Sequence, residues 1–284
     1  MKHVLIAGMD SYIGTYVAKA LMEEPGVFFV KAVDVRADAW EAEAFSGFDA
    51  VFHVAGIAHQ REAEVVAEDY YRVNRDLALR MARKAKAEGV SQFIFMSTMS
   101  VYGMVCGRIT AETREAPNTH YGKSKWMAEQ EILKLCDGRF KVSVVRPPMI
   151  YGKGCRGNYP RLSRMVQRLP AFPRVGNERS MLYIGCFYAF LRWLILSGDG
   201  GLYLPQNAAY VSTDELVRLI ALAHGQKIWQ PRGLGWLLRL LSSRVQTVGK
   251  VFGSLTYDLS MSAGPWNGEQ PAFSETVWLT EAGE

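Results

Sequence analysis

The segment that most constrains the fold of this chain lies at its start. An apolar run at 4–7 leads into the turn GMDSYIG at 8–14, and a helical pattern follows at 15–22. A strand, a turn of small residues and a helix form a pyrophosphate site, because exposed backbone N–H groups and the helix dipole both favour anions. A tight turn without a ligand is the alternative. We expect a dinucleotide to be bound by Gly8, Ser11, Tyr12, Ile13 and Gly14.

Short apolar runs alternate with helical patterns through the first half of the chain. The runs lie at 4–7, 27–33, 50–54, 92–96 and 142–145, and the long helical patterns at 69–88 and 120–135. Such alternation predicts parallel strands joined by crossover helices. We therefore expect an α/β fold with a Rossmann-type doubly wound parallel sheet, formed by a dinucleotide-binding domain over residues 1–152.

The sequence changes character after the segment YGKG at 151–154, where Gly, Pro and Arg become frequent. We expect a smaller C-terminal substrate-binding lobe over residues 153–284, with helices at 186–196 and 213–224 and with strands that could cross between the two domains. The apolar stretch Leu234–Val251 also carries three basic residues. It could lie on a membrane surface, but packing of its apolar face within the lobe is the favoured interpretation.

Composition narrows the class of protein. The 284 residues are 49% hydrophobic, which is enough for a full core, and carry a formal charge of +5. This mild excess suits an anionic small molecule better than a nucleic acid, for which a dense basic run is expected. The four cysteines are scattered without CxxC spacing, so neither a metal site nor a disulfide framework is indicated. With no export signal and no apolar stretch near 20 residues, we expect a cytoplasmic protein without stable membrane insertion.

Tyr121 and Lys125 are the first candidates for chemistry. They stand four residues apart within a helical pattern, so they share one face of the helix. An ammonium beside a phenol stabilises the phenolate, which would let the tyrosine act as a base near neutral pH. The same spacing is common on solvated helices, and only the surrounding motifs favour the catalytic interpretation.

Asp34 and Arg36 bear on the choice of dinucleotide. Asp34 lies 20 residues after Gly14, where a carboxylate accepts hydrogen bonds from the adenine ribose and favours NAD. Arg36 offers a cation to a 2′-phosphate, so NADP stays open. Only 14 residue steps separate Asp34 from Asp49, so the strand and helix normally found in this interval are expected to be shortened or missing. Asp34 could then belong to the next strand.

The order of the remaining motifs points to a family. They are the glycine turn, VFHVAG at 51–56, Asn74, Ser97-Thr98 before VYG at 101–103, Tyr121xxxLys125, and RPP at 146–148 with YG at 151–152. This order resembles the extended short-chain dehydrogenase/reductase family, and within it the NAD-dependent epimerase/dehydratase group that acts on nucleotide sugars. The resemblance covers almost the whole chain.

The resemblance implies a role for individual residues. Tyr121 is the expected acid/base, Thr98 bonds the reacting sugar hydroxyl, and Lys125 lowers the tyrosine pKa and bonds the nicotinamide ribose. Further residues are implied on the cofactor side: Val54, Ala55, Gly56, Asn74, Ser97, Pro147 and Pro148.

In the smaller lobe, Asn158 and Arg179 resemble residues that hold the nucleotide diphosphate of the substrate, and Arg156 is a further candidate. A guanidinium suits this work because it presents a bidentate donor fork. The resemblance also implies a homodimer, with pairing through the helices at 69–88 and 120–135, and a place in surface polysaccharide synthesis.

Three functions follow from these expectations. The leading one is reversible epimerisation at C4 of a UDP-sugar through a 4-keto intermediate, with NAD as the cofactor. An NAD(P)H-dependent 4-ketoreductase would use the same residues, and a non-catalytic dinucleotide-binding protein is the alternative from another class. A 4,6-dehydratase is disfavoured because Met99 follows Thr98 where that chemistry needs an acid.

Overall fold

The computed structural model describes residues 1–58, 65–231, 233, 249, 252–266 and 270–282. Most of the apolar stretch Leu234–Val251 lies outside the described residues. The chain forms two compact units, each assembled from three segments. Unit 1 consists of Met1–Gly103, Glu115–Pro147 and Tyr188–Pro205, and unit 2 of Met104–Arg114, Pro148–Phe187 and Gln206–Glu284. The domain boundary expected after Gly152 stays a prediction.

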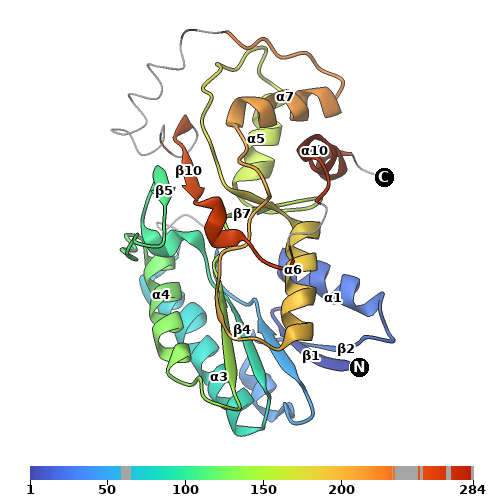
Figure 1. Cartoon of the computed structure of the whole chain (residues 1–284), viewed down its shortest axis with the longest axis vertical. Coiled ribbons are helices and arrows are strands. Elements are labelled where there is room, and N and C mark those ends of the chain that lie inside the picture. The colour runs from blue at the N-terminus through green and yellow to red at the C-terminus, as the bar shows by residue number, and fades with distance from the viewer. Residues whose placement is uncertain (59–64, 232, 234–248, 250–251, 267–269, 283–284) are drawn as a thin grey trace. The chain divides into compact units, whose positions relative to one another are not determined.

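Unit 1 is built on a six-stranded parallel sheet with the order β2-β1-β3-β4-β6-β9 (Figure 1). Its strands are β1 Lys2–Ala7, β2 Phe28–Val33, β3 Ala50–His53, β4 Gln92–Met96, β6 Lys141–Val145 and β9 Gly201–Tyr203. The first five match the predicted strands, and the order confirms the doubly wound parallel sheet. At the end of β1, Ala7 pairs with both Val33 and His53, so the glycine turn leaves the sheet between two neighbouring strand ends.

Helices cover both faces of this sheet. On one face α1 (Tyr12–Met22) lies beside α6 (Ile184–Ser197), and the Glu24 carboxylate after α1 accepts hydrogen bonds from Tyr188 and Arg192 of α6. On the other face, α3 (Ala78–Ala87) and α4 (His120–Leu133) pack over a buried apolar cluster that includes Leu5, Val51 and Phe93. Most of α6, together with β9, belongs to unit 1, although the sequence analysis assigned that helix to the smaller lobe. A helical pattern shows that a face is buried, but not which core buries it.

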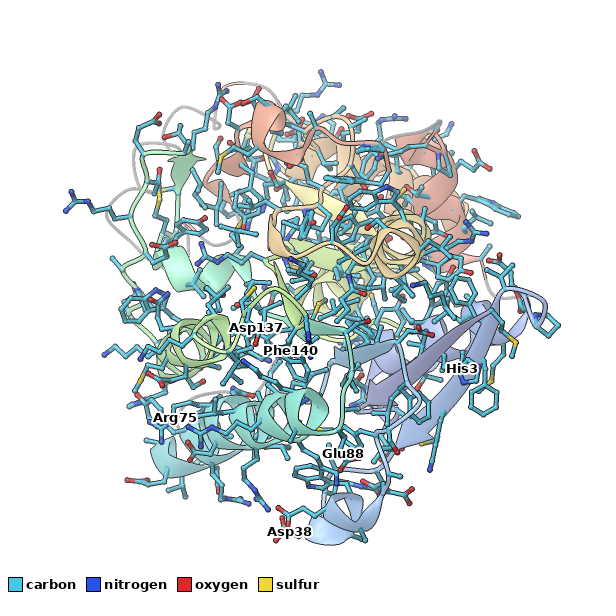
Figure 2. The ribbon with its side chains drawn as sticks, turned by 60° about the horizontal axis from the view of Figure 1, so that its bottom comes forward. His3, Asp38, Arg75, Glu88, Asp137 and Phe140 are labelled. Atoms are coloured by element: carbon cyan, nitrogen blue, oxygen red, sulfur yellow. The ribbon has the colours of Figure 1, made fainter. Side chains whose placement is uncertain are left out.

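The connection between β2 and β3 is short, as expected. A single turn of 3-10 helix, η1 (Asp38–Ala42), replaces the strand and helix that normally fill this interval. Buried Trp40 and Phe45 fix it to the core, and the Glu88 carboxylate at the end of α3 accepts a hydrogen bond from the Phe45 N–H (Figure 2). Asp34 therefore follows β2 directly and does not belong to the next strand.

The described residues of unit 2 form small parallel sheets and the helices α5 (Asn158–Val166), α7 (Thr213–Ala223) and α10 (Phe273–Glu281) around a core of their own. The sheets pair β7 (Met149–Tyr151) with β8 (Met181–Tyr183), and β5 (Gly107–Ile109) with β10 (Leu255–Tyr257). A 3-10 turn, η5, spans Leu259–Ser262. Within the described parts of the chain, no helix is long and apolar enough to cross a membrane.

Candidate active site

The glycine turn has the geometry of a phosphate cradle. Gly8 has a φ of +104°, and a Cβ there would lie 2.6 Å from the Ala55 nitrogen. A Cβ on Gly14 would lie 2.3 Å from the Gly8 carbonyl oxygen. Both positions therefore require glycine, because the backbone of the turn packs closely on itself and on the loop after β3 at the start of α1. Tyr12 and Ile13 form the first turn of that helix and are partly buried.

Ser11, the middle residue of the turn, is the N-cap of α1. Its hydroxyl accepts a hydrogen bond from the Gly14 N–H at 3.0 Å and donates to the Gly8 carbonyl at 2.7 Å. The serine therefore closes the turn on itself and supplies the side-chain acceptor that a helix start needs. Its proton is used inside the turn.

Asp34 and Arg36 are joined to each other and to the glycine turn. The Arg36 guanidinium binds both oxygens of the Asp34 carboxylate at 2.6–3.1 Å and lies 3.0 Å from Asp10. This pairing holds the pKa of Asp34 at about 2, well below its ordinary value, so the carboxylate is charged at neutral pH. Two carboxylates thus flank the Arg36 cation that the sequence offered to a 2′-phosphate.

The loop after β3 runs close against the end of β1. The N–H groups of Val54 and Ala55 both donate to the Ala7 carbonyl, at 3.0 and 2.9 Å. At Gly56, a Cβ would lie 2.8 Å from the Asn74 amide oxygen and 3.1 Å from the Lys125 nitrogen. The expected cofactor loop is therefore packed directly on two other predicted site residues.

Asn74 ties this loop to helix α4. It lies in the π-helical segment η3 (Arg72–Leu77) between α2 (Ala67–Tyr71) and α3, and it is fully buried. Its amide accepts from the Ile57 N–H at 2.8 Å and donates to the Ile57 carbonyl and to the Ser124 hydroxyl. The Ser124 hydroxyl in turn bonds the Tyr121 carbonyl. π-helical bulges are frequent at functional sites. Here the Asn74 amide joins the loop after β3 to helix α4.

Thr98 and Tyr121 are brought together. Thr98 follows β4 and caps the 3-10 turn η4 (Met99–Tyr102), where its hydroxyl accepts from the Ser100 N–H at 3.1 Å and donates to the Ser100 hydroxyl at 3.3 Å. Its side chain also interacts with that of Tyr121. Tyr121 lies in the first turn of α4, where a Cβ on Gly122 would lie 2.7 Å from the Ser100 carbonyl. This close approach of helix and turn sets the two hydroxyls side by side. Burial raises the pKa of Tyr121, and the interaction with Thr98 opposes that rise.

Lys125 is buried one helical turn beyond Tyr121. Its ammonium donates to the Met96 carbonyl at 2.9 Å and lies 4.8 Å from the centre of the Phe95 ring. Burial lowers the pKa of Lys125 to about 8, and the Glu129 carboxylate opposes that change. The structure thus gives the lysine fixed partners at the end of β4, while its expected effect on the pKa of Tyr121 stays a prediction.

Two further predicted residues have partners within unit 1. The buried Ser97 hydroxyl donates to Glu129 of α4, and the Pro147 carbonyl accepts from the Met99 N–H at 3.0 Å. The buried Glu129 and Arg146 that complete this region were not predicted as site residues. Two signals in the sequence could have found them. Arg146 directly follows the apolar run at 142–145, and Glu129 stands four residues after Lys125.

The substrate candidates lie in unit 2, as does the buried Pro148. Arg156 is exposed, and Asn158 is the exposed first residue of α5, preceded by Gly157 with a φ of +96°. The half-buried Arg179 donates to the Gly253 carbonyl at 3.1 Å, and burial lowers its pKa. These residues therefore stand at a helix start and beside β10.

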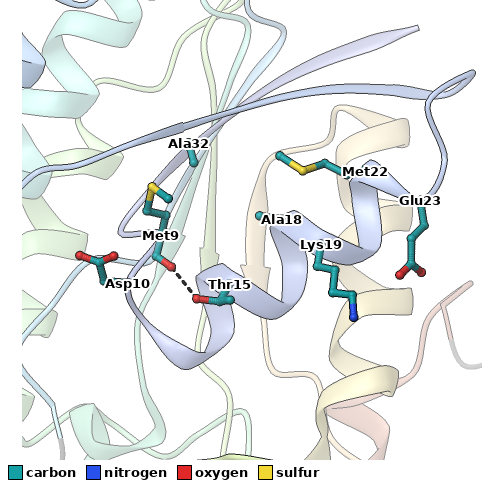
Figure 3. A pocket seen from close by; sticks show the side chains of 8 residues that line it. All are labelled: Met9, Asp10, Thr15, Ala18, Lys19, Met22, Glu23 and Ala32. Atoms are coloured by element: carbon teal, nitrogen blue, oxygen red, sulfur yellow. Dashed lines mark hydrogen bonds between the residues drawn. The ribbon is translucent and has the colours of Figure 1, made fainter.

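A groove of about 620 Å³ borders the glycine turn but is not the candidate active site (Figure 3). It lies along α1 and β2 and is lined by Met9, Asp10, Thr15, Ala18, Lys19, Met22, Glu23 and Ala32. The Thr15 hydroxyl donates to the Met9 carbonyl at its edge. Thr98 and Tyr121 lie on other elements: Thr98 directly follows β4, and Tyr121 is in the first turn of α4.

The order of the sheet and the glycine turn after its first strand define a Rossmann-type α/β fold. Residues 4–179 match the family described as the NAD dependent epimerase/dehydratase family, and the chain belongs to that family. It is 28% identical to the UDP-glucose 4-epimerase of Vibrio cholerae, over 91% of this chain and 88% of the relative. It is also 28% identical to the N-acetyl-alpha-D-glucosaminyl-diphospho-ditrans,octacis-undecaprenol 4-epimerase of Escherichia coli O157:H7, over 70% of this chain and 65% of that protein.

Solved structures share the fold across both units. The UDP-glucuronic acid 4-epimerase from Bacillus cereus, in complex with NAD, matches with a TM-score of 0.76 at 15% identity, covering 98% of this chain and 97% of that one. MoeE5 in complex with UDP-glucose and NAD matches with a TM-score of 0.72 at 19% identity, with the same coverage.

Proposed function

We propose that this protein is an NAD-dependent 4-epimerase of a UDP-hexose. The observation that carries the proposal is the interacting pair of Thr98 and Tyr121 at the end of β4, with the buried Lys125 on the same helix. The phenolate of such a tyrosine can take the proton of a sugar hydroxyl that the Thr98 hydroxyl bridges to it. The two relatives at 28% identity are both named as 4-epimerases, which supports this reaction.

The glycine turn fits a dinucleotide. Its two glycines stand in a close-packed turn between β1 and the start of α1, where a helix N-terminus favours a phosphate, and the Asp34 carboxylate directly follows β2, where it would bind a ribose. The residues that would hold NAD are Gly8, Ser11, Tyr12, Ile13, Gly14, Asp34, Val54, Ala55, Gly56, Lys125, Pro147 and Pro148. When bound, NAD supplies a hydride acceptor that later returns the hydride.

The side chains of the protein handle the proton and the orientation of the sugar. Tyr121 takes the proton of the C4 hydroxyl, Thr98 bridges the two oxygens, and the Lys125 cation stabilises the phenolate. Inversion at C4 requires the sugar to turn while its diphosphate stays bound. We assign that anchoring to Arg179 and Asn158, with Arg156 as a further contact, because a charged guanidinium and a helix start both favour phosphate.

The reaction distinguishes this proposal from its alternatives. An epimerase regenerates its cofactor in each turnover, whereas a 4-ketoreductase consumes one reduced cofactor for each product. The purified protein is therefore incubated with UDP-glucose or UDP-N-acetylglucosamine and NAD, without NADH or NADPH, and the C4 epimer is measured by NMR. We expect the epimer in catalytic excess over cofactor. No epimer from any substrate in the panel would rule out epimerisation of these sugars.

Tyr121→Phe tests the assigned acid/base within the same assay. We expect kcat to fall at least about 10³-fold, because a positioned general base contributes about 10²–10⁴. Tyr71→Phe is the matched control, since Tyr71 is a partly buried tyrosine hydrogen-bonded to His120. Equal turnover by the two variants would remove Tyr121 from the mechanism.

A lipid-linked sugar is a second candidate substrate. The Escherichia coli relative is named for a sugar carried on undecaprenol through a diphosphate, which offers the same diphosphate group for anchoring. Including undecaprenyl-diphospho-N-acetylglucosamine in the panel separates the two carriers. We further propose a cytoplasmic homodimer acting in surface polysaccharide synthesis, and light scattering at known concentration measures its mass.

A further inference from the structure

A buried ionic cluster joins the ends of β4, β6 and α4. Its centre is the Glu129 carboxylate on α4, which accepts from the Arg146 Nε at 3.1 Å to each oxygen and from Nη2 at 2.5 Å. The side chains of Glu129 and Arg146 are 0% and 4% exposed. Their bidentate geometry is the strongest form of this pairing, and a buried carboxylate without it would be costly.

Other polar groups complete the cluster. The Ser97 hydroxyl donates to Glu129, and the Arg146 Nη1 donates to the Tyr102 hydroxyl at 2.9 Å and to Glu115 at 2.6 Å. Glu129 and Arg146 are thus each held by more than one partner, and they link Ser97, Tyr102 and Glu115 into one network.

Each anchored residue adjoins a residue of the proposed reaction. Ser97 precedes Thr98, Arg146 precedes Pro147, and Glu129 lies one helical turn beyond Lys125. A displacement of about 1 Å in such a support can cost about 10²-fold in rate, because reacting groups must stay aligned.

The cluster also balances charge around Lys125. The lysine faces the Met96 carbonyl from β4, His53 from β3, and Glu129 from its own helix. Burial lowers the pKa of His53 to about 3, so the imidazole is neutral and adds no second positive charge beside the lysine. Two carboxylates, Glu129 and Glu115, then face two cations, Arg146 and Lys125. Glu129 is the carboxylate that opposes loss of the lysine proton.

We propose that Glu129 is a positioning residue for the epimerase site, which holds Thr98 through Ser97 and keeps Lys125 protonated beside Tyr121. The proposal rests on the proposed function for its consequence in catalysis. Its electrostatic part concerns the folded protein alone, so it can be tested without substrate or cofactor.

The first test compares the pH dependence of stability in wild type and Lys125→Met. The pKa of Lys125 is about 8 in the folded protein and 10.5 ordinarily, so between these values the unfolded chain binds the extra proton. Unfolding is then increasingly disfavoured as pH rises, and the wild type gains stability over Lys125→Met from about pH 8 upward. The same comparison is then made between Glu129→Gln and the double variant Glu129→Gln/Lys125→Met. Without the Glu129 charge, the gain in stability that comes from Lys125 should begin about one pH unit lower.

Glu115→Gln is the matched control, because it removes the other carboxylate on Arg146. It should leave the onset of the gain at the wild-type pH. An unchanged onset in Glu129→Gln, or an equal shift in both variants, would overturn the proposal. If Glu129→Gln does not fold, Glu129→Asp decides: it keeps the charge and should keep the onset, and a full unit of downward shift would overturn the proposal.

The second test follows kcat against pH with UDP-glucose. In Glu129→Gln we expect the alkaline limb to move down together with the onset of the stability gain, and Glu129→Asp to restore its position. The onset of the stability gain could shift in Glu129→Gln while neither the wild type nor any variant is active. That result would reject the proposed reaction but would still support the effect of Glu129 on Lys125. Activity in the wild type with an alkaline limb that does not move in Glu129→Gln would reject the catalytic role of Glu129.

Discussion

The Arg36 guanidinium binds both carboxylate oxygens of Asp34, immediately after the strand that pairs with β1. The same guanidinium lies 3.0 Å from Asp10 in the glycine turn. Arg36, which the sequence alone suggests as a partner for a 2′-phosphate, is therefore already paired with two carboxylates.

This pairing predicts a preference for NAD over NADP. A 2′-phosphate would be placed near two negative charges, so we expect NADP to bind at least about tenfold more weakly. Asp34→Asn should narrow that ratio, because it removes one of the charges and frees Arg36. Isothermal titration of both cofactors measures the effect, and Asp38→Asn, at an exposed aspartate paired with Arg80, is the control. Tighter binding of NADP by the wild type would contradict the assignment.

The glycine turn predicts a steric loss at Gly14. In Gly14→Ala the new Cβ would meet the Gly8 carbonyl at 2.3 Å, and this neighbour is backbone that cannot swing away. We expect a loss of about 2 kcal/mol in the free energy of unfolding, as for other overpacked sites. Binding of NAD should be lost as well. Gly26→Ala, where nothing lies within 4 Å, should change stability by less than about 0.5 kcal/mol. Denaturant unfolding and calorimetry give both quantities, and similar behaviour of the two variants would refute the prediction.

Asn74 predicts a link between stability and cofactor binding. Asn74→Ala leaves the partly buried Ile57 N–H and carbonyl and the buried Ser124 hydroxyl without their side-chain partner. We expect a loss of about 2–3 kcal/mol, since buried polar groups left unpaired cost about 1–3 kcal/mol each. Weaker NAD binding should follow because the loop at Gly56 loses its support. Asn118→Ala removes one exposed bond to the Gly103 carbonyl and should cost under about 1 kcal/mol. Urea midpoints of the two variants are compared.

Tyr121 predicts a late ionisation in the protein without cofactor. Burial raises its pKa above the ordinary value of 10, so the phenol should ionise only above pH 10. Because the pKa of Tyr121 is higher in the folded than in the unfolded protein, its contribution to the free energy of unfolding is complete below pH 10 and is lost as pH rises beyond it. The absorbance change at alkaline pH, wild type minus Tyr121→Phe, reports this ionisation.

Thr98 sharpens the same measurement. Thr98→Val removes the hydroxyl whose interaction lowers the pKa of Tyr121, so ionisation should move higher still, and kcat should fall about 10²-fold. Thr98→Ser keeps the hydroxyl and should restore both. Ionisation of Tyr121 below pH 9 in the wild type would contradict the expected burial.

The sequence by itself determined the family and the first five strands of the sheet. Periodicity reveals buried faces, and the glycine spacing reveals a backbone that must come close to another group. For this reason the turn at Gly8 and the helix of Tyr121 could be predicted from local patterns alone.

Tertiary structure decided which distant segments meet. No local pattern shows that β9 completes the sheet of unit 1, or that Arg36 binds Asp34 and Asp10 together. The partners of Ser97 and Lys125 were equally hidden, because the Glu129 and Arg146 cluster joins residues up to 44 positions apart. A buried charge selects its partner in three dimensions, by desolvation and geometry, and sequence separation carries little of that information.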